Sequence, residues 1–450
     1  MSEPVVVLGG SPAGLRAAAG LAASGHSVTL VCPGTSASGV DHEDLPIDTG
    51  AAFVTDFLAE LTREVMGPMT PLAGLEVPQT GVLCRGSAAS LPLSRGDVAR
   101  FFDVGAALPA AFAWTEVRFR QRFGEYVGGW SELRTYEDWV RFHFSEPVFR
   151  HVYASYCQKR WGAPDEVGAA IARRHHGFYE EGALLAPSSG PAGAIAEQLE
   201  RLSGEGHQVL FNQTINGLRV EDGRVVAVET ASGDIDVPGS LFSAHPPDQM
   251  LSWLSDALPA AIAGEGKHLT CRHSVQVLLP VEEEPEFFET HIVDASVSAW
   301  RMIRPSTLPG CGSLAGHVML HLTVDESDPF WGVSAREVGD RLGAQLARTG
   351  YVIPAEGGEV RVNRLPHHQP MWTHTFHPAW TRAMLAMNGL GVRFVGRAGA
   401  FAQFDLHGEI QLLEGLVNNN VADQHELHLM FVDPPVSNDE RLSLRRFIAS

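Results

Sequence analysis

The sequence predicts an α/β protein in which a domain built on a parallel sheet is interleaved with a second domain of helices and strands. Three observations lead to this prediction. A strand, a glycine-rich turn, a helix and a second strand follow one another at the N-terminus. Short apolar stretches typical of buried strands recur between helical stretches further along the chain. A chain of 450 residues also exceeds what a single core usually supports.

The N-terminal unit is typical of a Rossmann-like, dinucleotide-binding domain. Val5–Leu8 is a β-branched run expected in a strand that is buried on both faces. Gly9 permits the tight turn that follows, and Gly14 lets the next helix pack closely against the strand. Small residues in the turn let backbone N–H groups and the helix N-terminus approach a pyrophosphate. We therefore predict cofactor contacts at Gly9, Ser11, Pro12, Ala13 and Gly14.

Two residues depart from the dinucleotide-binding pattern. Ser11 stands where the second glycine is usual, although serine is small enough for close approach. Cys32 ends the second strand, Val28–Val31, where an acid usually binds the ribose hydroxyls, and it is kept as a candidate contact. The acids of the following loop, Asp41, Glu43 and Asp44, are possible substitutes. The alternative is an inherited turn that no longer binds a nucleotide.

The rest of the chain alternates between helical and strand patterns. Residues 51–179 read as mostly helical, with helical spacing over 53–61, and Asp222-Gly223 predicts a hairpin between two alternating runs. The other expected elements are helices at 194–202, 333–348 and 409–418 and strands at 209–211, 241–244, 274–279, 316–322 and 391–397.

Charge and cysteine content limit the partners and the compartment. Lys and Arg total 33 against 53 Asp and Glu, a net charge of −20 that disfavours nucleic acid and anionic membrane as partners. Lys159 and Lys267 are the only lysines, which we attribute to codon usage. No apolar run reaches the ~18 residues of a membrane-spanning helix. The five cysteines are scattered without a Cys-x-x-Cys spacing, so we expect a reducing, cytoplasmic location. They are Cys32, Cys84, Cys157, Cys271 and Cys311.

Four stretches, taken in order with the N-terminal turn, resemble the flavin-containing amine oxidase superfamily, in particular its protoporphyrinogen oxidase-like and UDP-galactopyranose mutase-like branch. They are Ile47-Asp48-Thr49-Gly50, the Tyr-x-x-Lys-x-Trp-Gly segment of residues 156–162, the Pro-x-Gly-Gly-like stretch of residues 187–193, and the Gly-Arg-x-Gly-x-Phe motif of residues 396–401. The resemblance covers nearly the whole chain.

The resemblance implies a Rossmann-like FAD-binding domain interleaved with a helical-plus-sheet substrate domain. The expected divisions are 1–52, 186–250 and 389–432 for FAD binding, 53–185 and 251–388 for the substrate domain, and a surface tail at 433–450. By position, Ile215 would hold the adenine through its backbone, and Gly396, Arg397 and Phe401 would lie beside the flavin. The substrate would be a small molecule, and the sequence indicates no oligomeric state.

Candidate substrate and catalytic residues follow from their places in these motifs. His407 and Asp405 come just after the flavin-side motif and are candidates for proton transfer, or alternatively cap the last helix. Arg301 and Arg304 could hold a carboxylate or diphosphate, or belong to a solvated strand edge. Tyr156, His368 and Trp372 complete the candidate substrate pocket. No metal site is expected, because no carboxylate completes a ligand spacing around His367, His368, His374 and His377.

Three functions are compatible with this pattern. The first is an FAD-dependent oxidoreductase that transfers a hydride from an organic small molecule to the flavin. The second is a non-redox flavoenzyme on the same fold, such as a sugar-nucleotide mutase or an isomerase. The third is a degenerate, flavin-free family member that acts as a binding or partner protein, which the altered position Cys32 favours.

Overall fold

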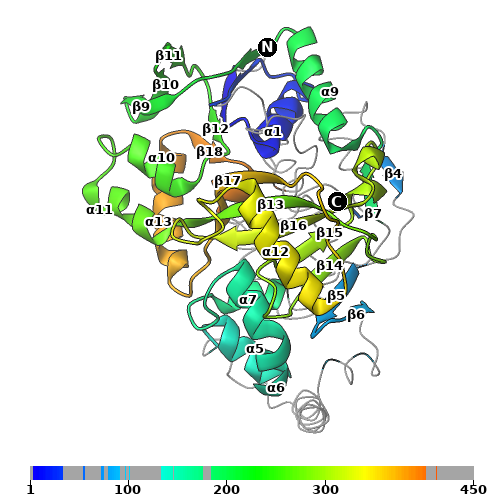
Figure 1. Ribbon diagram of the computed structural model, residues 1–450. Coiled ribbons are helices and arrows are strands. Elements are labelled where there is room, and N and C mark those ends of the chain that lie inside the picture. The colour runs from blue at the N-terminus through cyan, green and yellow to red at the C-terminus, as the bar shows by residue number, and fades with distance from the viewer. Residues whose placement is uncertain are drawn as a thin grey trace.

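The computed structural model describes residues 4–33, 54–55, 72–74, 80–91, 97, 101, 133–144, 146–175, 184–401 and 412. Within them the molecule has a five-stranded parallel sheet, a larger seven-stranded mixed sheet and a group of helices beyond the larger sheet (Figure 1). The elements are mixed α and β, as the sequence predicts.

The five-stranded sheet has the strand order β18–β12–β1–β2–β8, and all of its pairings are parallel. Its strands are β1 (Val5–Leu8), β2 (Val28–Val31), β8 (Gln208–Leu210), β12 (Leu241–Ser243) and β18 (Val392–Phe394). Helices α1 (Pro12–Ala23) and α9 (Gly190–Gly204) pack against one another and against this sheet (Figure 1). The sheet thus draws on three separated stretches of the chain. The residue boundaries of the interleaved domains remain a prediction.

A small antiparallel sheet follows α9, formed by β9 (Ile215–Glu221), β10 (Arg224–Thr230) and β11 (Gly233–Asp236). Asp222 and Gly223 join β9 to β10 with positive φ values of 49° and 75°. These values fit the tight hairpin turn that an Asp-Gly pair predicts.

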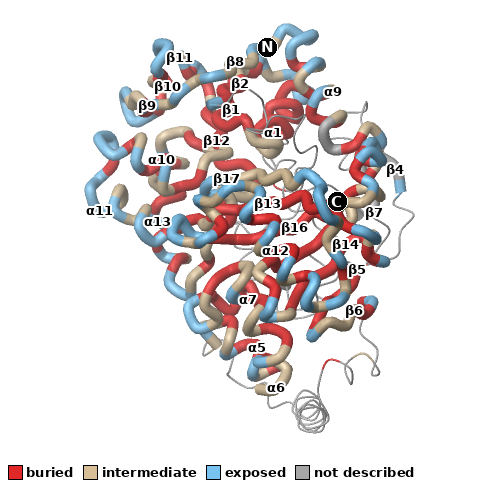
Figure 2. The backbone as a smooth tube through the Cα atoms, in the orientation of Figure 1, coloured by how far each residue is buried: buried red, intermediate tan, exposed pale blue. Residues whose placement is uncertain are grey.

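The seven-stranded sheet has the order β17–β13–β16–β15–β14–β5–β6. Its strands are β5 (Thr80–Cys84), β6 (Ser87–Ser90), β13 (Cys271–Pro280), β14 (Glu289–Ile292), β15 (Arg301–Ile303), β16 (His317–Val324) and β17 (Arg361–Pro370). Helix α12 (Ala335–Thr349) covers one face, where Val338, Leu342 and Leu346 join the apolar side chains of β13 and β16 (Figures 1 and 2). The opposite face carries polar side chains.

Helices lie beyond the seven-stranded sheet and beside it. The first group is α5 (Tyr136–Phe144), α6 (Glu146–Val148), a π-helical turn (Phe149–Tyr153), α7 (Ala154–Arg160) and α8 (Ala169–His175). A second group is α10 (Pro247–Trp253), α11 (Ala260–Ala263), α13 (Phe376–Gly389) and α14 (Gly396–Gly399). Among the described helices, none is long and apolar enough to cross a membrane.

Three expectations differ from the structure. The stretch expected to be mostly helical contains β5 and β6, which add two strands to the larger sheet. Helical spacing was misleading at Val54–Thr55, which form β3 and pair with β7 (Leu184–Pro187), itself paired with β4 (Leu72–Gly74). The strand expected at 391–397 ends at Phe394, because α14 begins at Gly396. Strands β5 and β6 form a local hairpin through Arg85-Gly86, and β5 also pairs with the distant β14; β3 pairs with the distant β7, which overrides the local pattern there.

Candidate functional site

The turn between β1 and α1 is shaped by two glycines. Gly9 has a φ of +115°, a conformation that other residues rarely adopt. A Cβ on Gly14 would lie 2.1 Å from the backbone oxygen of Gly9. Both positions therefore require glycine, Gly9 for the tight turn and Gly14 for the close approach of α1 to β1.

The start of α1 leaves few N–H groups for a ligand. Ser11 is the N-cap residue, and its hydroxyl accepts a hydrogen bond from the Gly14 N–H at 3.3 Å. Pro12, at the first helical position, has no N–H to donate. The backbone N–H groups of Ser11 and Ala13 remain as donors at this helix end, and residues 11–13 are partly exposed. A ligand phosphate would therefore find fewer free backbone N–H donors here than at the usual glycine-rich helix N-terminus.

Helix α14 packs directly on this turn. A Cβ on Gly396 would lie 2.4 Å from the Cβ of Ala13, and one on Gly399 would lie 2.4 Å from the backbone oxygen of Ser243. The two glycines of the C-terminal motif thus allow α14 to approach both α1 and β12. The structure brings together the predicted cofactor residues 9–14 and 396–397.

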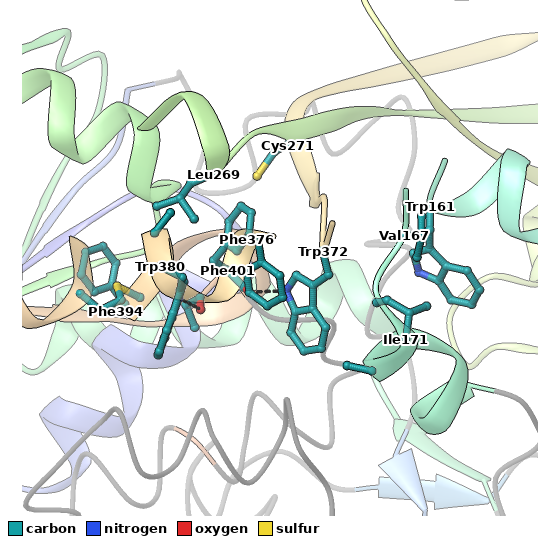
Figure 3. Packing of buried hydrophobic residues seen from close by; sticks show 14 of the residues in the cluster. Trp161, Val167, Ile171, Leu269, Cys271, Trp372, Phe376, Trp380, Phe394 and Phe401 are labelled. Carbon is teal, nitrogen blue, oxygen red and sulfur yellow. Dashed lines mark hydrogen bonds between the residues drawn. The ribbon is translucent and has the colours of Figure 1, made fainter. Parts of the chain in front are cut away.

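Two tryptophans fix the chain where α14 ends. The indole N–H of Trp372 donates to the backbone oxygen of Phe401 at 2.7 Å, and that of Trp380 donates to the oxygen of Ala400 at 3.3 Å (Figure 3). Trp372 is 1% exposed and stacks on Phe376. It was predicted to line the substrate pocket, and the structure places it in the core beside Phe401. Asp405 and His407 lie outside the described residues.

Cys32 lies at the end of β2 and is hydrogen-bonded to the segment that leads from β8 to Ile215. The Cys32 N–H donates to the oxygen of Leu210, and the Cys32 oxygen accepts from the N–H of Gln213, two residues before Ile215. The Cys32 side chain is fully buried in the core of the parallel sheet. Burial raises the pKa of this thiol to about 12. The thiol is thus buried and both backbone polar groups of Cys32 are paired within the protein.

A row of polar side chains crosses the seven-stranded sheet on the face away from α12. Asn363 pairs with Gln276, Gln276 with His321, His321 with Arg301, and Arg301 with His291. Directly opposed residues on neighbouring strands project from the same face. We call these five residues the polar row.

Arg301 is the centre of the polar row. It is 9% exposed, and its Nη1 donates to Oε1 of Glu289 at 3.0 Å. Its Nη2 lies 3.2 Å from Nδ1 of His321. Burial, followed by the charge of Arg301, lowers the pKa of His321 well below its usual range. Arg301 is thus an interior residue, and the solvated-edge interpretation was wrong.

Helix α7 contributes a second guanidinium to the same face. Arg160 Nη1 donates to the Tyr156 hydroxyl at 2.8 Å, and that hydroxyl lies 2.9 Å from Nδ1 of His291. Because a guanidinium can only donate, the Tyr156 hydroxyl donates its proton to His291. The guanidiniums of Arg160 and Arg301 lie 4.3 and 4.8 Å from the ring centroid of Trp300. Tyr156 therefore joins α7 to the polar row.

Arg304 does not join this group. Its Nη1 donates to the backbone oxygen of Pro285 at 3.0 Å, and its backbone N–H donates to the backbone oxygen of Phe288. It stands three residues after Arg301, so the two side chains leave the strand on opposite sides. The two arginines do not form one clamp.

A bulge in β17 determines the position of His368. The pairing of β13 with β17 shifts between Arg272 and Ser274, and His367 adopts a φ of +50° within the bulge. Bulges commonly re-aim side chains next to functional sites. Burial, then the charges of Arg397 and Arg301, lower the pKa of His368 to about 3. His368 thus lies near enough to Arg397 of α14 and to Arg301 of the polar row for their charges to act on it.

Lys159 stabilises the loop that leads to Trp300. Its Nζ donates to the backbone oxygens of Asp294 at 3.0 Å and of Val297 and Ala299 at 3.2 Å each, and also to that of Ile292. Burial lowers the pKa of Lys159 to about 7. This lysine, one of two in the chain, therefore has a specific structural role.

Sequence reasoning missed six residues of this site: Arg160, Gln276, Glu289, His291, Trp300 and His321. Arg160 lies within a quoted motif, and Trp300 adjoins a predicted residue. Gln276 and His321 had a usable signal, because each interrupts a run of apolar residues, over 275–279 in β13 and 318–322 in β16. Among the described residues, no group of three or more His, Cys, Asp or Glu side chains could hold a metal ion.

No family model matches the sequence, and no curated protein matches it either. Solved structures do match. The chain is similar to reduced UDP-galactopyranose mutase, with a TM-score of 0.69 and 14% identity over 96% of this chain and 98% of that one. It is similar to cyclohexylamine oxidase from Brevibacterium oxydans IH-35A, with a TM-score of 0.64 and 14% identity over 94% and 99%.

A protein from Exiguobacterium sp. 255-15, provisionally named a protoporphyrinogen oxidase, also matches. Its TM-score is 0.66, with 15% identity over 93% of this chain and 99% of that one. The chain has the amine oxidase fold. The resemblance predicted from the motifs is thereby confirmed for the fold, over nearly the whole length. Within the amine oxidase fold, the β1–α1 turn and the polar row belong to two different sheets that α14 and β17 bring into contact.

Proposed function

We propose that this protein is an FAD-dependent oxidoreductase that oxidises an organic small molecule. The observation that carries the proposal is the close packing of α14 on the β1–α1 turn at Gly396 and on β12 at Gly399, beside a turn that itself requires Gly14. This arrangement joins the two motifs that the family resemblance assigns to the cofactor. Bound FAD would supply the redox chemistry by accepting the electrons that the substrate loses.

The residues fit a dinucleotide at the turn and leave the polar row for the substrate. The N-terminus of α1, including the Ala13 N–H, would hold the pyrophosphate, and Arg397 on α14 would face the flavin. Tyr156 and Arg301 would orient the substrate, and their mutual network with His291 and Glu289 restricts their rotamers. The proton-transfer roles of Asp405 and His407 stay predictions.

A non-redox flavoenzyme is the second candidate. The likeness to a UDP-galactopyranose mutase supports it, and so do two guanidiniums on the polar face, those of the buried Arg301 and the half-buried Arg160. A flavin-free binding protein is the third, supported by the burial of Cys32 where an acid would contact the ribose.

Flavin reduction separates the first two candidates. Purified protein is mixed anaerobically with candidate substrates while the flavin absorbance is recorded. Bleaching by a substrate, with oxidised product formed in equal amount, supports the oxidoreductase. Turnover only after the flavin has been chemically reduced, with no net oxidation of the substrate, would contradict it in favour of the mutase or isomerase.

A further inference from the structure

Four buried N–H groups on the polar face of the seven-stranded sheet have no hydrogen-bond partner among the described residues. They are Nε of Arg160, Nε2 of Gln276, Nε1 of Trp300 and Nε2 of His321. We call these four residues the donor face. Gln276, His321 and Trp300 are respectively 1%, 3% and 8% exposed. Leaving a buried donor unpaired is costly, so several unpaired donors together indicate a missing partner.

The hydrogen bonds already present determine that all four groups are donors. His321 Nδ1 faces Nη2 of Arg301, which can only donate, so Nδ1 accepts. Since His321 is neutral, its proton is on Nε2. Gln276 Oε1 accepts from Nδ2 of Asn363, which leaves the Gln276 amide N–H free. Indole and guanidinium N–H groups donate by nature.

These groups lie close together. Gln276 and His321 are directly opposed on β13 and β16. The rings of Trp300 and His321 have centroids 5.8 Å apart, and the Arg160 guanidinium lies over Trp300. The donor face therefore lines one part of the sheet.

The charged side chains around the donor face also indicate that the missing partner is an anion. Arg301 is paired with Glu289, whereas no carboxylate of the described residues forms an ion pair with Arg160. Buried guanidiniums need compensating negative charge. The site is thus cationic within a protein whose net charge is −20.

We propose that the donor face binds an oxyanion, a carboxylate or a phosphate group, carried by the substrate. The assignment of this oxyanion to the substrate rests on the proposed function. An ammonium group would face the four unpaired donors and the guanidiniums of Arg160 and Arg301, with the Glu289 carboxylate already paired to Arg301, so we expect this site not to bind a small amine despite the amine oxidase fold. The dinucleotide phosphates are assigned to the N-terminus of α1, on the other sheet.

Calorimetric titration of the purified full-length protein tests this proposal. The probes are benzoate, phenyl phosphate and benzylamine, and the flavin content of each preparation is recorded from its absorbance. We expect benzoate or phenyl phosphate to bind and benzylamine not to bind. The stronger of the two anions identifies the source of the oxyanion as carboxylate or phosphate.

Two variants and a control locate the binding. Arg160→Gln removes a donor and its charge, and Gln276→Glu replaces a donor with an acceptor of similar shape. Each should weaken the anion at least about tenfold. Arg336→Gln removes the same charge from an exposed position on α12, on the opposite face of the sheet, and should leave the affinity unchanged. Circular dichroism verifies that each variant is folded.

Two results would overturn the proposal. One is benzylamine binding as tightly as the anions, or no anion binding at all. The other is anion binding that the folded Gln276→Glu and Arg160→Gln variants leave intact. Anion binding in protein that neither contains nor takes up flavin would support the oxyanion site while contradicting the proposed function.

Discussion

Single residues decide how closely backbone segments approach at the candidate cofactor site. A Cβ on Gly14 would lie within 2.1 Å of the Gly9 oxygen, so even a methyl group must displace α1 from β1. We predict that Gly14→Ala lowers the amount of FAD retained by the purified protein several-fold, measured by absorbance after heat release of the flavin. Gly204→Ala is the matched control, because a Cβ at this helical glycine meets no atom within 4 Å. Equal flavin retention in both variants would contradict a functional turn.

His321 makes the stability of the fold depend on pH. In the unfolded chain its pKa is ordinary, at 6.5, whereas burial and the charge of Arg301 lower it in the folded chain. The unfolded state therefore binds more protons below this pH, and stability is lost as the pH falls, by at most about 1.4 kcal/mol per pH unit.

The variant His321→Gln tests this pH dependence. Glutamine keeps a donor and an acceptor but does not titrate in this range, so its urea midpoint should fall less than that of the wild type between about pH 7 and about pH 5. His317→Gln, at the partly exposed start of the same strand, should behave as the wild type does. Parallel pH profiles for wild type and His321→Gln would disprove the assignment.

At the scale of the element, Lys159 determines the conformation of the loop between β14 and β15. Its ammonium group satisfies four backbone oxygens of residues 292–299, and Trp300 follows directly. We predict that Lys159→Met destabilises the protein by at least about 2 kcal/mol in urea unfolding, because these oxygens lose their donor. The exposed Lys267, the only other lysine, provides the control, and Lys267→Met should stay within about 0.5 kcal/mol of wild type.

Chemical modification gives an independent measure of the same element. An amine-reactive reagent should modify Lys267 readily and Lys159 only after unfolding, as read by mass spectrometry of peptides. Rapid modification of Lys159 in the native protein would contradict its buried position.

Elements formed by local signals were predictable from the sequence. The strand–turn–helix unit at Gly9 and the Asp222-Gly223 hairpin depend on residues adjacent in the chain, and both form where predicted. Strand β5 was missed although it forms a local hairpin with β6; its other partner, β14, lies more than two hundred positions away and leaves no local signal.

The candidate site was predictable only in part for the same reason. The polar row takes its residues from five strands, and sheet register alone places Gln276 beside His321. Arg301 was identified from sequence, but its burial and its separation from Arg304 depend on the register of β15. Trp372 was assigned to the substrate pocket because its packing on Phe376 and Phe401 leaves no local signal.

At the scale of the whole molecule, two sheets carry the two candidate binding sites. The parallel sheet presents a glycine-shaped turn and a helix N-terminus, and the seven-stranded sheet presents a cationic donor face. Helix α14 and strand β17 connect them, since Arg397 and His368 lie close enough for the charge of Arg397 to lower the pKa of His368. A net charge of −20 is compatible with both sites, because their donors are local backbone N–H groups and buried arginines.

The visible absorption spectrum of the purified protein, recorded before and after incubation with FAD and removal of the excess, tests the central claim most directly. The account predicts the bands of a bound flavin at roughly one flavin per chain. A folded protein that shows no flavin bands as purified, and takes up none from added FAD, would contradict it.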